Sequence, residues 1–320
     1  MRWQAVALSQ IDLDLAAVPT AMPPDLERLT ASMEAIGLIN PPWLRPRPGG
    51  ERFTVVTGRR RLWATAALGW REITARLVPA EASDFFCLLV HLFDNAFSRG
   101  FNLKEQAELA ARLAAHEGEA TVAASYLPYL GLPPSPAHLE RLLKLADLEA
   151  PWQRLAAEGR LALTAGALLA EWSPADRAAA QPFLEHLPLS QSKQEEFLEQ
   201  VGLLARREGS SPAAVLARME LQAALGEPHR TPQERSAKVR RHLYRRVYPR
   251  LSAAKESFGA ALGRLGWQQT PRIRLKPPAA FEGPDFLLEI KFRDAPELLA
   301  LLKEIQRLAQ PQEFDALTRS

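Results

Sequence analysis

Three consecutive arginines follow a glycine in residues 57–67, TGRRRLWATAA. Arg59, Arg60 and Arg61 repel one another, and this cost is easiest to understand if an anion lies among them. A glycine at a strand end lets the backbone approach a ligand closely, and the following helix offers unpaired N–H groups and the positive end of its dipole. Arginine adds forked, charge-assisted hydrogen bonds that suit phosphate oxygens. Residues 57–67 therefore indicate a phosphate-binding corner, with an ordinary basic surface as the alternative.

A second candidate for anion binding lies near the end of the chain. Between Arg230 and Lys276 there are thirteen Arg and Lys against two Glu, a net charge of +11 in a chain whose total is +3. Such a compact basic segment favours a polyanionic partner, double-stranded DNA, over a solvated surface. Val239, Leu243 and Val247 recur every four residues and predict an amphipathic helix that packs on one side and contacts DNA phosphates on the other. The phosphate-contacting residues are expected to be Arg235, Lys238, Arg241, Arg245 and Arg246.

The arginine corner requires a scaffold, which we expect to be a small mixed α/β domain over residues 1–80. Its pattern alternates strand-like and helix-like segments, separated by glycine and proline. The expected elements are a strand within 6–13, a helix over 24–36, two strands joined by a Pro/Gly turn within 41–58, a helix over 62–68 and a strand over 72–78.

After Pro79 the strand patterns stop, and residues 81–225 read as an all-helical middle domain. Helices are expected over 83–96, 103–116, 121–130, 136–148, 151–158 and 164–171, with more up to Leu225. A linker at 226–232 opens a third domain, 226–320, with a basic helix over 233–265 that Pro249 interrupts. The chain then continues as strand, Pro/Gly loop, strand and helix. The expected fold class is therefore α+β.

The C-terminal strand–strand–helix segment is too small to be stable by itself. Its helix, residues 295–308, is heavily apolar, and two strands with one helix bury too little surface. Pairing with a second copy would bury these side chains, which predicts a homodimer. The alternative is that the segment docks on the chain's own helical domain.

Composition limits the classes of protein to consider. The 320 residues include one cysteine, Cys87, so no intrachain disulfide can form, and a reducing cytoplasm is the expected location. The first 19 residues lack the apolar stretch of a signal peptide, and no run of about 18 apolar residues predicts a membrane span.

Three segments, in this order and spacing, resemble motifs of the ParB partition-protein family, whose members bind CTP and clamp DNA. The first is Gly37-Leu38-Ile39-Asn40-Pro41, where the family shows G-[IL]-[LI]-Q-P. The second is residues 58–64, GRRRLWA, against G-E-R-R-x-R-A. The third is residues 94–107, DNAFSRGFNLKEQA, against E-N-x-x-R-x-x-L-N-x-x-E-x-A. The resemblance extends through residues 138–170 and the C-terminal segment, and leaves about 190–230 without a match.

The resemblance implies CTP and Mg²⁺ as ligands of the N-terminal domain. It assigns the cytosine pocket to residues 37–41, the triphosphate to the glycine and arginines of the second motif, and the ion to Asp94. It assigns further phosphate contacts to the helical side of the site. The implied nucleotide-binding residues are Gly37, Leu38, Asn40, Pro41, Gly58, Arg59, Arg60, Arg61, Asn95 and Arg99.

Several residues depart from the family motifs. Arg59 stands for Glu and Trp63 for Arg, while Asn40 replaces Gln and Asp94 replaces Glu. Arg59 makes the corner more cationic, which favours a triphosphate, but it removes a carboxylate that could place a metal or a water. We therefore expect nucleotide binding to survive, and slow CTP hydrolysis is left open.

Residues 126–148 resemble the family's helix-turn-helix. Gly131 permits the turn, Ser135 is suited to cap the second helix, and Pro136 suits its first position. The expected base-reading side chains are Ser135, His138, Arg141 and Lys144. A helical hairpin that has lost its specificity is the alternative, because Pro133 and Pro134 replace polar residues.

Asn102 and Glu105 in the third motif also fit an ordinary helix cap, so that interpretation stays open beside the nucleotide role. Asp94, Asn95 and Arg99 lack such a local explanation.

The leading hypothesis is a CTP-dependent DNA clamp of the ParB type in chromosome or plasmid segregation, with the nucleoid as its location. A ParA-type ATPase would be a further partner, but Arg2 is the only basic residue before Arg28, so the expected basic arm is missing. One alternative is a nucleotide-independent DNA-binding transcriptional regulator on the same scaffold. Another is an enzyme of the sulfiredoxin type, which the lack of a cysteine in the arginine corner argues against.

Overall fold

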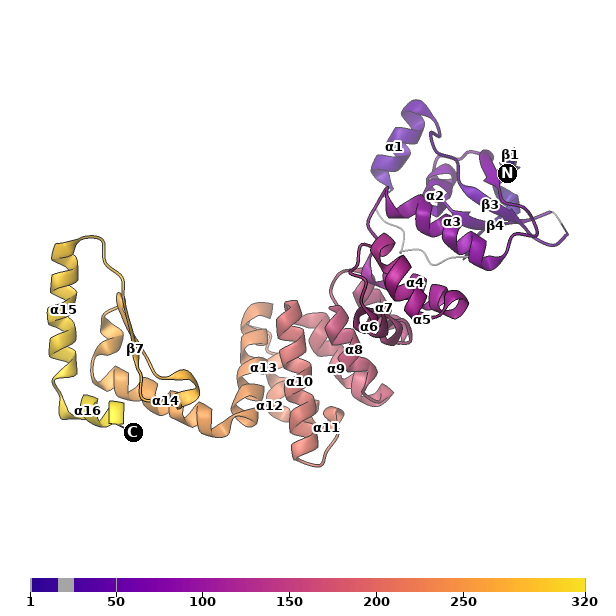
Figure 1. Ribbon diagram of the computed structural model, residues 1–320. Helices are drawn as coiled ribbons and strands as arrows, with labels where there is room; N and C mark the ends of the chain where they lie inside the picture. The colour runs from indigo at the N-terminus through magenta and orange to yellow at the C-terminus, as the bar shows by residue number, and fades with distance from the viewer. Residues whose placement is uncertain (1, 17–25, 50, 320) are drawn as a thin grey trace.

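The structure, a computed structural model, describes residues 2–16, 26–49 and 51–319. The N-terminal sheet and the C-terminal strand pair lie at opposite ends of the molecule, and helices fill the space between them (Figure 1). The predicted α+β class is confirmed. No helix in the described ranges is long and apolar enough to cross a membrane.

The N-terminal sheet is five-stranded, in the order β1-β5-β3-β4-β2. The pairs β1–β5 and β3–β4 are antiparallel, whereas β5–β3 and β4–β2 are parallel. The single strand expected within 6–13 is wrong, because a 3-10 turn at Leu8–Gln10 separates two strands that occupy opposite edges. The strands are β1 (Arg2–Ala7), β2 (Ile11–Ala16), β3 (Trp43–Pro46), β4 (Phe53–Thr57) and β5 (Glu72–Leu77).

Helices cover both faces of this sheet. Val55 and Ile73 on one face pack with Leu62 of α2 (Arg59–Ala67). Val56 on the other face packs with Cys87 of α3 (Asp84–Ala96). Helix α1 (Glu27–Ile36) contacts α2, and Pro24 and Asp25 of the predicted helix lie outside the described residues. The end of β4 therefore lies between two helices, and this is where the arginine corner forms.

The helical middle shares one continuous apolar core, from Leu88 of α3 to Val247 near the C-terminal part. The segment expected as a helix over 121–130 is helical, but its geometry is not that of an α-helix. It consists of a π-helical turn at Val122–Tyr126 and a 3-10 segment at Leu127–Leu130, where Pro128 lacks the N–H that an α-helix needs. The middle helices are α4 (Leu103–Glu117), α5 (Glu119–Thr121), α6 (Pro136–Ala146), α7 (Ala150–Ala157), α8 (Leu163–Ala170), α9 (Pro174–His186), α10 (Gln191–Arg207), α11 (Pro212–Leu216) and α12 (Met219–Leu225).

The basic segment forms two helices, α13 (Pro232–Val247) and α14 (Pro249–Arg264), divided at Pro249 as predicted. Strand β6 (Ile273–Lys276) then pairs antiparallel with β7 (Leu287–Ile290). The chain ends in α15 (Ala295–Ala309) and a short helix that was not expected, α16 (Gln312–Arg319). Figure 1 shows α15 away from the middle helices, so the segment is not docked on the chain's own helical domain.

Candidate functional site

A glycine that no other residue can easily replace forms the strand-to-helix corner. Gly58 follows the last residue of β4 and has a φ of 93°. A Cβ at this position would lie 2.9 Å from both Cα and Cβ of Pro42, so the position requires glycine for conformation and for space. Helix α2 begins directly at Arg59, earlier than the expected Leu62, which places all three arginines in its first turn. No side chain caps this turn, and no acidic residue lies in it.

A pocket of about 630 Å³ opens in front of this first turn. It brings together eight of the residues expected to bind nucleotide or metal: Asn40, Gly58, Arg59, Arg60, Arg61, Asp94, Asn95 and Arg99. Six further residues line it: Leu29, Thr57, His91, Ser98, Gly100 and Glu105. We call this cavity the arginine pocket.

The arginine pocket has an excess of positive charge, because four arginines face two carboxylates among its lining residues. Arg60 is exposed and, within the described ranges, makes no hydrogen bond or ion pair. The guanidinium of Arg59 lies 5.7 Å from the ring centroid of Trp63. The first turn of α2 adds the positive end of the helix dipole. The pocket therefore favours an anion.

The third arginine of the corner is held by the protein. Arg61 donates to the carbonyl oxygens of Asn40 (2.5 Å) and Pro41 (3.3 Å), and to Oδ2 of Asp94 (3.2 Å). The same Asp94 oxygen accepts from Thr57 Oγ1 at 2.8 Å. These contacts tie the loop before β3, the end of β4 and α3 together around the pocket.

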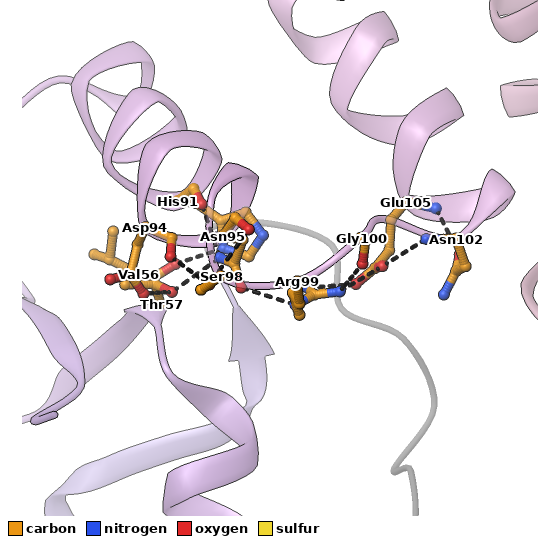
Figure 2. Close-up of polar contacts among 10 residues, drawn as sticks. All are labelled: Val56, Thr57, His91, Asp94, Asn95, Ser98, Arg99, Gly100, Asn102 and Glu105. Atoms are coloured by element: carbon orange, nitrogen blue, oxygen red, sulfur yellow. Dashed lines mark hydrogen bonds and ion pairs between the residues drawn. The ribbon is translucent and has the colours of Figure 1, made fainter. Parts of the chain in front are cut away.

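The helical wall is a chain of hydrogen bonds from β4 to α4 (Figure 2). Asn95 Nδ2 donates to Thr57 Oγ1 (3.2 Å) and to the carbonyl of His91 (2.8 Å), while its Oδ1 accepts from Arg99 Nε (2.8 Å). Arg99 in turn donates two hydrogen bonds to Glu105, each of 2.8 Å. The Glu105 side chain is 1% exposed, and the pairing with Arg99 and the helix cap both compensate its buried charge.

Glu105 and Asn102 form a complete capping box at the start of α4, as the capping interpretation of the motif expected. Since Glu105 also lines the pocket, the capping and the site interpretations of this residue do not exclude each other.

His91 lies buried at the back of the pocket, one helical turn before Asn95. Its Nδ1 lies 3.1 Å from the carbonyl oxygen of Val56, which accepts a hydrogen bond from the neutral ring. Its Nε2 is buried and has no hydrogen-bond partner among the described residues. Burial lowers the pKa of His91 to about 4, a fall that the nearby Arg99 assists. His91 is therefore neutral at physiological pH.

Of the stretch expected to form a cytosine pocket, only Asn40 lines the arginine pocket. Leu38 and Pro41 line a separate cavity of about 470 Å³ together with Trp3 and Trp70. Gly37 ends α1 with a φ of 77° and lines neither cavity. The stretch expected to form the cytosine pocket is thus divided between the arginine pocket and this second cavity.

Cys87 does not have the surroundings of a reactive thiol. It is fully buried between α3 and the sheet, and burial raises the pKa of its thiol. It lies outside the arginine pocket, which agrees with setting aside thiol chemistry of the sulfiredoxin type.

The expected DNA-reading side chains on α6 are mostly engaged by the protein. Ser135 accepts from the N–H of His138 and caps the helix. Lys144 forms ion pairs with Glu140 (3.1 Å) and Glu171 (3.3 Å). His138 is half-buried, and burial followed by the charge of Arg141 lowers its pKa. Arg141 alone of the four is an exposed cation without an ion pair among the described residues.

The five basic residues expected on α13 differ in the same way. Lys238 pairs with Glu227 (2.8 Å), Arg245 with Glu256 (2.7 Å) and Arg246 with Glu208 (3.9 Å). Arg235 donates to the carbonyl of Leu225, and Arg241 is exposed without an ion pair among the described residues. The opposite face packs as expected, with Val239, Leu243 and Val247 buried.

Sequence reasoning missed Thr57 and His91 as site residues. Thr57 directly precedes Gly58, and a hydroxyl at that strand end was a usable signal. His91 lies four residues before Asn95, which places both on one face of a helix. The partnership of Arg99 with Glu105 had no comparable signal, because the loop between α3 and α4 determines it.

Comparison with known proteins gives one family and several solved structures. The family model described as the ParB N-terminal domain matches residues 2–91. One similar structure is the C-terminally truncated chromosome-partitioning protein ParB from Caulobacter crescentus complexed to the centromeric parS site. It has 21% identity and a TM-score of 0.35, covering 62% of this chain and 99% of that one.

The structure of the same Caulobacter crescentus protein complexed with CTP-gamma-S has 21% identity and a TM-score of 0.27, covering 58% of this chain and 99% of that one. A Pnob8-like ParB-N domain has 14% identity and a TM-score of 0.35, covering 77% and 97%. No curated protein matches the chain.

Proposed function

We propose that the chain is a ParB-type partition protein that binds CTP in the arginine pocket. The premise is that residues 2–91 belong to the ParB N-terminal domain family, which confirms the resemblance noted for this part of the sequence. The observation that carries the proposal is the corner at Gly58, where an uncapped helix start and an excess of arginine meet in one cavity. A triphosphate supplies the negative charge that this corner lacks.

The geometry supports a triphosphate more than a single small anion. The cavity of about 630 Å³ lies in the range of small-molecule sites, roughly 300–1,000 Å³. Arg60 and the first-turn N–H groups of α2 are placed to hold the phosphate nearest the corner. The role of Arg59 is to add charge at the same turn, beside Trp63.

Asp94 fits a supporting role in Mg²⁺ binding but does not form a metal site alone. Among the described residues, no three His, Cys, Asp or Glu side chains are grouped as a metal site. Mg²⁺ in nucleotide sites is held by one or two carboxylates together with phosphate oxygens and water. Oδ2 of Asp94 accepts from Thr57 and Arg61, so Oδ1 would be the oxygen to face the ion, which would screen the phosphate charge.

DNA binding in this proposal has two parts. Helix α13 and the segment after it, with their excess of positive charge, would contact phosphates without reading sequence. Helix α6 would enter the major groove with Arg141 as the principal base-contacting side chain, since its other expected readers are engaged by the protein. The chain would accordingly be associated with the nucleoid.

A homodimer through the C-terminal segment completes the proposed clamp. Leu287 is 55% exposed, Phe292 52% and Leu299 61%, and all three lie on β7, α15 or the loop between them. A two-stranded sheet with such exposed apolar side chains is unstable alone, and a second copy would cover them. Nucleotide binding would then draw the two N-terminal domains together around DNA.

A DNA-binding regulator that needs no nucleotide is the second candidate. One observation favours it: the groups of Arg61, Asn95 and Arg99 already form hydrogen bonds within the protein. In that function the arginine pocket would be a structural junction between the sheet and the helical domain.

Calorimetric titration with CTP, ATP, GTP and UTP in Mg²⁺ buffer, with and without DNA, separates the two candidates. The CTP-binding proposal predicts that CTP binds at least tenfold tighter than the other three nucleotides. DNA binding that is unchanged by CTP, with no heat of nucleotide binding, would establish the regulator instead.

A further inference from the structure

Arg99 has little capacity left for a ligand in the described structure. A guanidinium has five N–H donors. Four of those of Arg99 point at protein oxygens: Nε at Asn95 Oδ1, two at the Glu105 carboxylate and one at the carbonyl of Gly100 (3.2 Å). Although Arg99 lines the arginine pocket, Glu105 takes two of its five donors, more than any other residue in the described ranges.

Glu105 has two simultaneous roles. Its carboxylate accepts both hydrogen bonds from Arg99, and its Oε2 also accepts from the backbone N–H of Asn102 at 3.1 Å. In return the N–H of Glu105 donates to Asn102 Oδ1 at 2.9 Å. The first turn of α4 and the position of Arg99 therefore depend on one buried carboxylate (Figure 2).

Helix α4 connects this turn to the helical domain. It contacts α3 on the pocket side and packs against α6 and α7, and Leu109 and Leu113 lie in the shared apolar core. The connection between α3 and α4 is the short segment 97–102, so these helices cannot move independently of the turn that joins them.

We propose that Glu105 is a positioning residue that competes with a polyphosphate in the arginine pocket for the guanidinium of Arg99. Without ligand, Glu105 holds Arg99 and completes the cap of α4. With ligand, phosphate oxygens take over part of the Arg99 donors, and the buried carboxylate loses its counter-charge. The first turn of α4 then loosens, which couples ligand binding to the orientation of the helical domain. The inference rests on the proposed function only in requiring a polyphosphate in this pocket.

Two substitutions separate the ion pair from the cap. Glu105→Gln removes the charge that holds Arg99, while the glutamine oxygen still accepts from the Asn102 N–H, as capping boxes allow. Asn102→Ala removes the other half of the capping box and leaves the Arg99–Glu105 pair in place. The probes are inorganic tripolyphosphate and CTP, each titrated calorimetrically into the full chain in Mg²⁺ buffer.

We expect Glu105→Gln to bind tripolyphosphate about tenfold more tightly than the unmodified chain, and Asn102→Ala to differ less than twofold. In hydrogen exchange of the unmodified chain, saturating tripolyphosphate should speed exchange of amides 102–106 about tenfold. This second measurement needs no variant, so a folding defect in Glu105→Gln does not affect it.

The outcomes distinguish this inference from the proposed function. Tight CTP binding with amides 102–106 better protected, and an unchanged affinity in Glu105→Gln, would overturn the role of Glu105 and leave the CTP proposal intact. Equal binding of tripolyphosphate and CTP with faster exchange at 102–106 would support Glu105 and contradict the CTP proposal. If neither probe binds, both are wrong.

Discussion

The arginine pocket and the N-terminal part of α6 are two candidate sites of one chain, and they differ in what defines them. The pocket is defined by backbone: a left-handed glycine, an uncapped helix start and a strand end between two helices. The α6 site depends on four side chains, three of which the protein already uses or partly buries. A sequence resemblance therefore predicts a site better where backbone geometry defines the site than where exposed side chains define it.

The arginine pocket and the surroundings of α6 also differ in charge. The lining of the arginine pocket has an excess of arginine over carboxylate. Residues 81–225, which contain α6, have twelve Arg and Lys against nineteen Asp and Glu, a net charge of −7. Such a domain gains little from phosphate attraction, so DNA affinity should come mainly from the basic segment that begins at Arg230.

The largest effect is expected from alanine at Gly58, in comparison with Gly131, another positive-φ glycine that precedes α6. Gly58→Ala should cost about 3 kcal/mol of unfolding free energy, because left-handed strain adds to a clash with Pro42. Gly131→Ala, before α6, has a φ of 77° but nothing within 4 Å of its Cβ, so about 1 kcal/mol is expected. Chemical denaturation of both variants checks this, and equal costs would mean that the approach of Pro42 is unimportant.

His91 at the arginine pocket and His138 on α6 allow a comparison of how the free energy of unfolding depends on pH. The folded-state pKa of His91 is about 4, below the ordinary 6.5, so the unfolded state binds a proton more readily. The contribution of His91 to the free energy of unfolding is therefore fully present above about pH 6.5. It falls by up to about 1.4 kcal/mol per pH unit as the pH drops toward 4.

Denaturation from pH 7 to 4.5 measures this slope. His91→Gln should flatten it, while His138→Gln should change it less, since His138 is only half-buried. An unchanged slope in His91→Gln would show that other groups cause the loss.

A matched pair of exposed arginines tests whether the two sites have separate ligands. Arg60→Ala should weaken CTP binding roughly 10- to 100-fold, the value of a lost charge-assisted hydrogen bond to phosphate. Arg141→Ala should leave CTP affinity within twofold. Calorimetry on both variants measures these affinities. Equal losses of CTP affinity would contradict the view that the two sites have separate ligands.

The smallest effect is expected on DNA. Arg141→Ala should weaken binding to a preferred site about tenfold and relax preference at one base pair, whereas Arg241→Ala on α13 should weaken all sequences and reduce the salt slope by about one. Fluorescence anisotropy at several salt concentrations distinguishes these patterns. A uniform loss in Arg141→Ala would show that α6 contacts only phosphates.

Much of the fold was predictable from periodicity and from glycine and proline. Apart from the earlier start of α2 at Arg59, the helices and strands around the corner lie close to where the apolar pattern placed them, since burial determines that pattern. The split of β1 and β2 was missed, although the sequence carries a signal for it: the apolar alternation shifts by one position across the 3-10 turn, from Val6 and Leu8 to Ile11 and Leu13. The π and 3-10 geometry of residues 122–130 was not predicted, because Pro128 lies within an otherwise α-helical pattern.

The site was predictable only in part. Gly58, Arg60 and Asp94 meet as expected because motif spacing and strand order bring them together. The stretch 37–41 is divided between two cavities, because its loop turns over Gly58 and presents only Asn40 to the pocket. Which arginine is engaged and which is exposed depends on contacts between distant segments, and the sequence does not contain that information locally.

The most direct test of the account is a crystal structure of the full chain with CTP and Mg²⁺. The account predicts the triphosphate against the first turn of α2, with the guanidinium of Arg60 within hydrogen-bonding distance of a phosphate oxygen. A nucleotide bound elsewhere, with the arginine pocket empty and Arg60 in solvent, would contradict it.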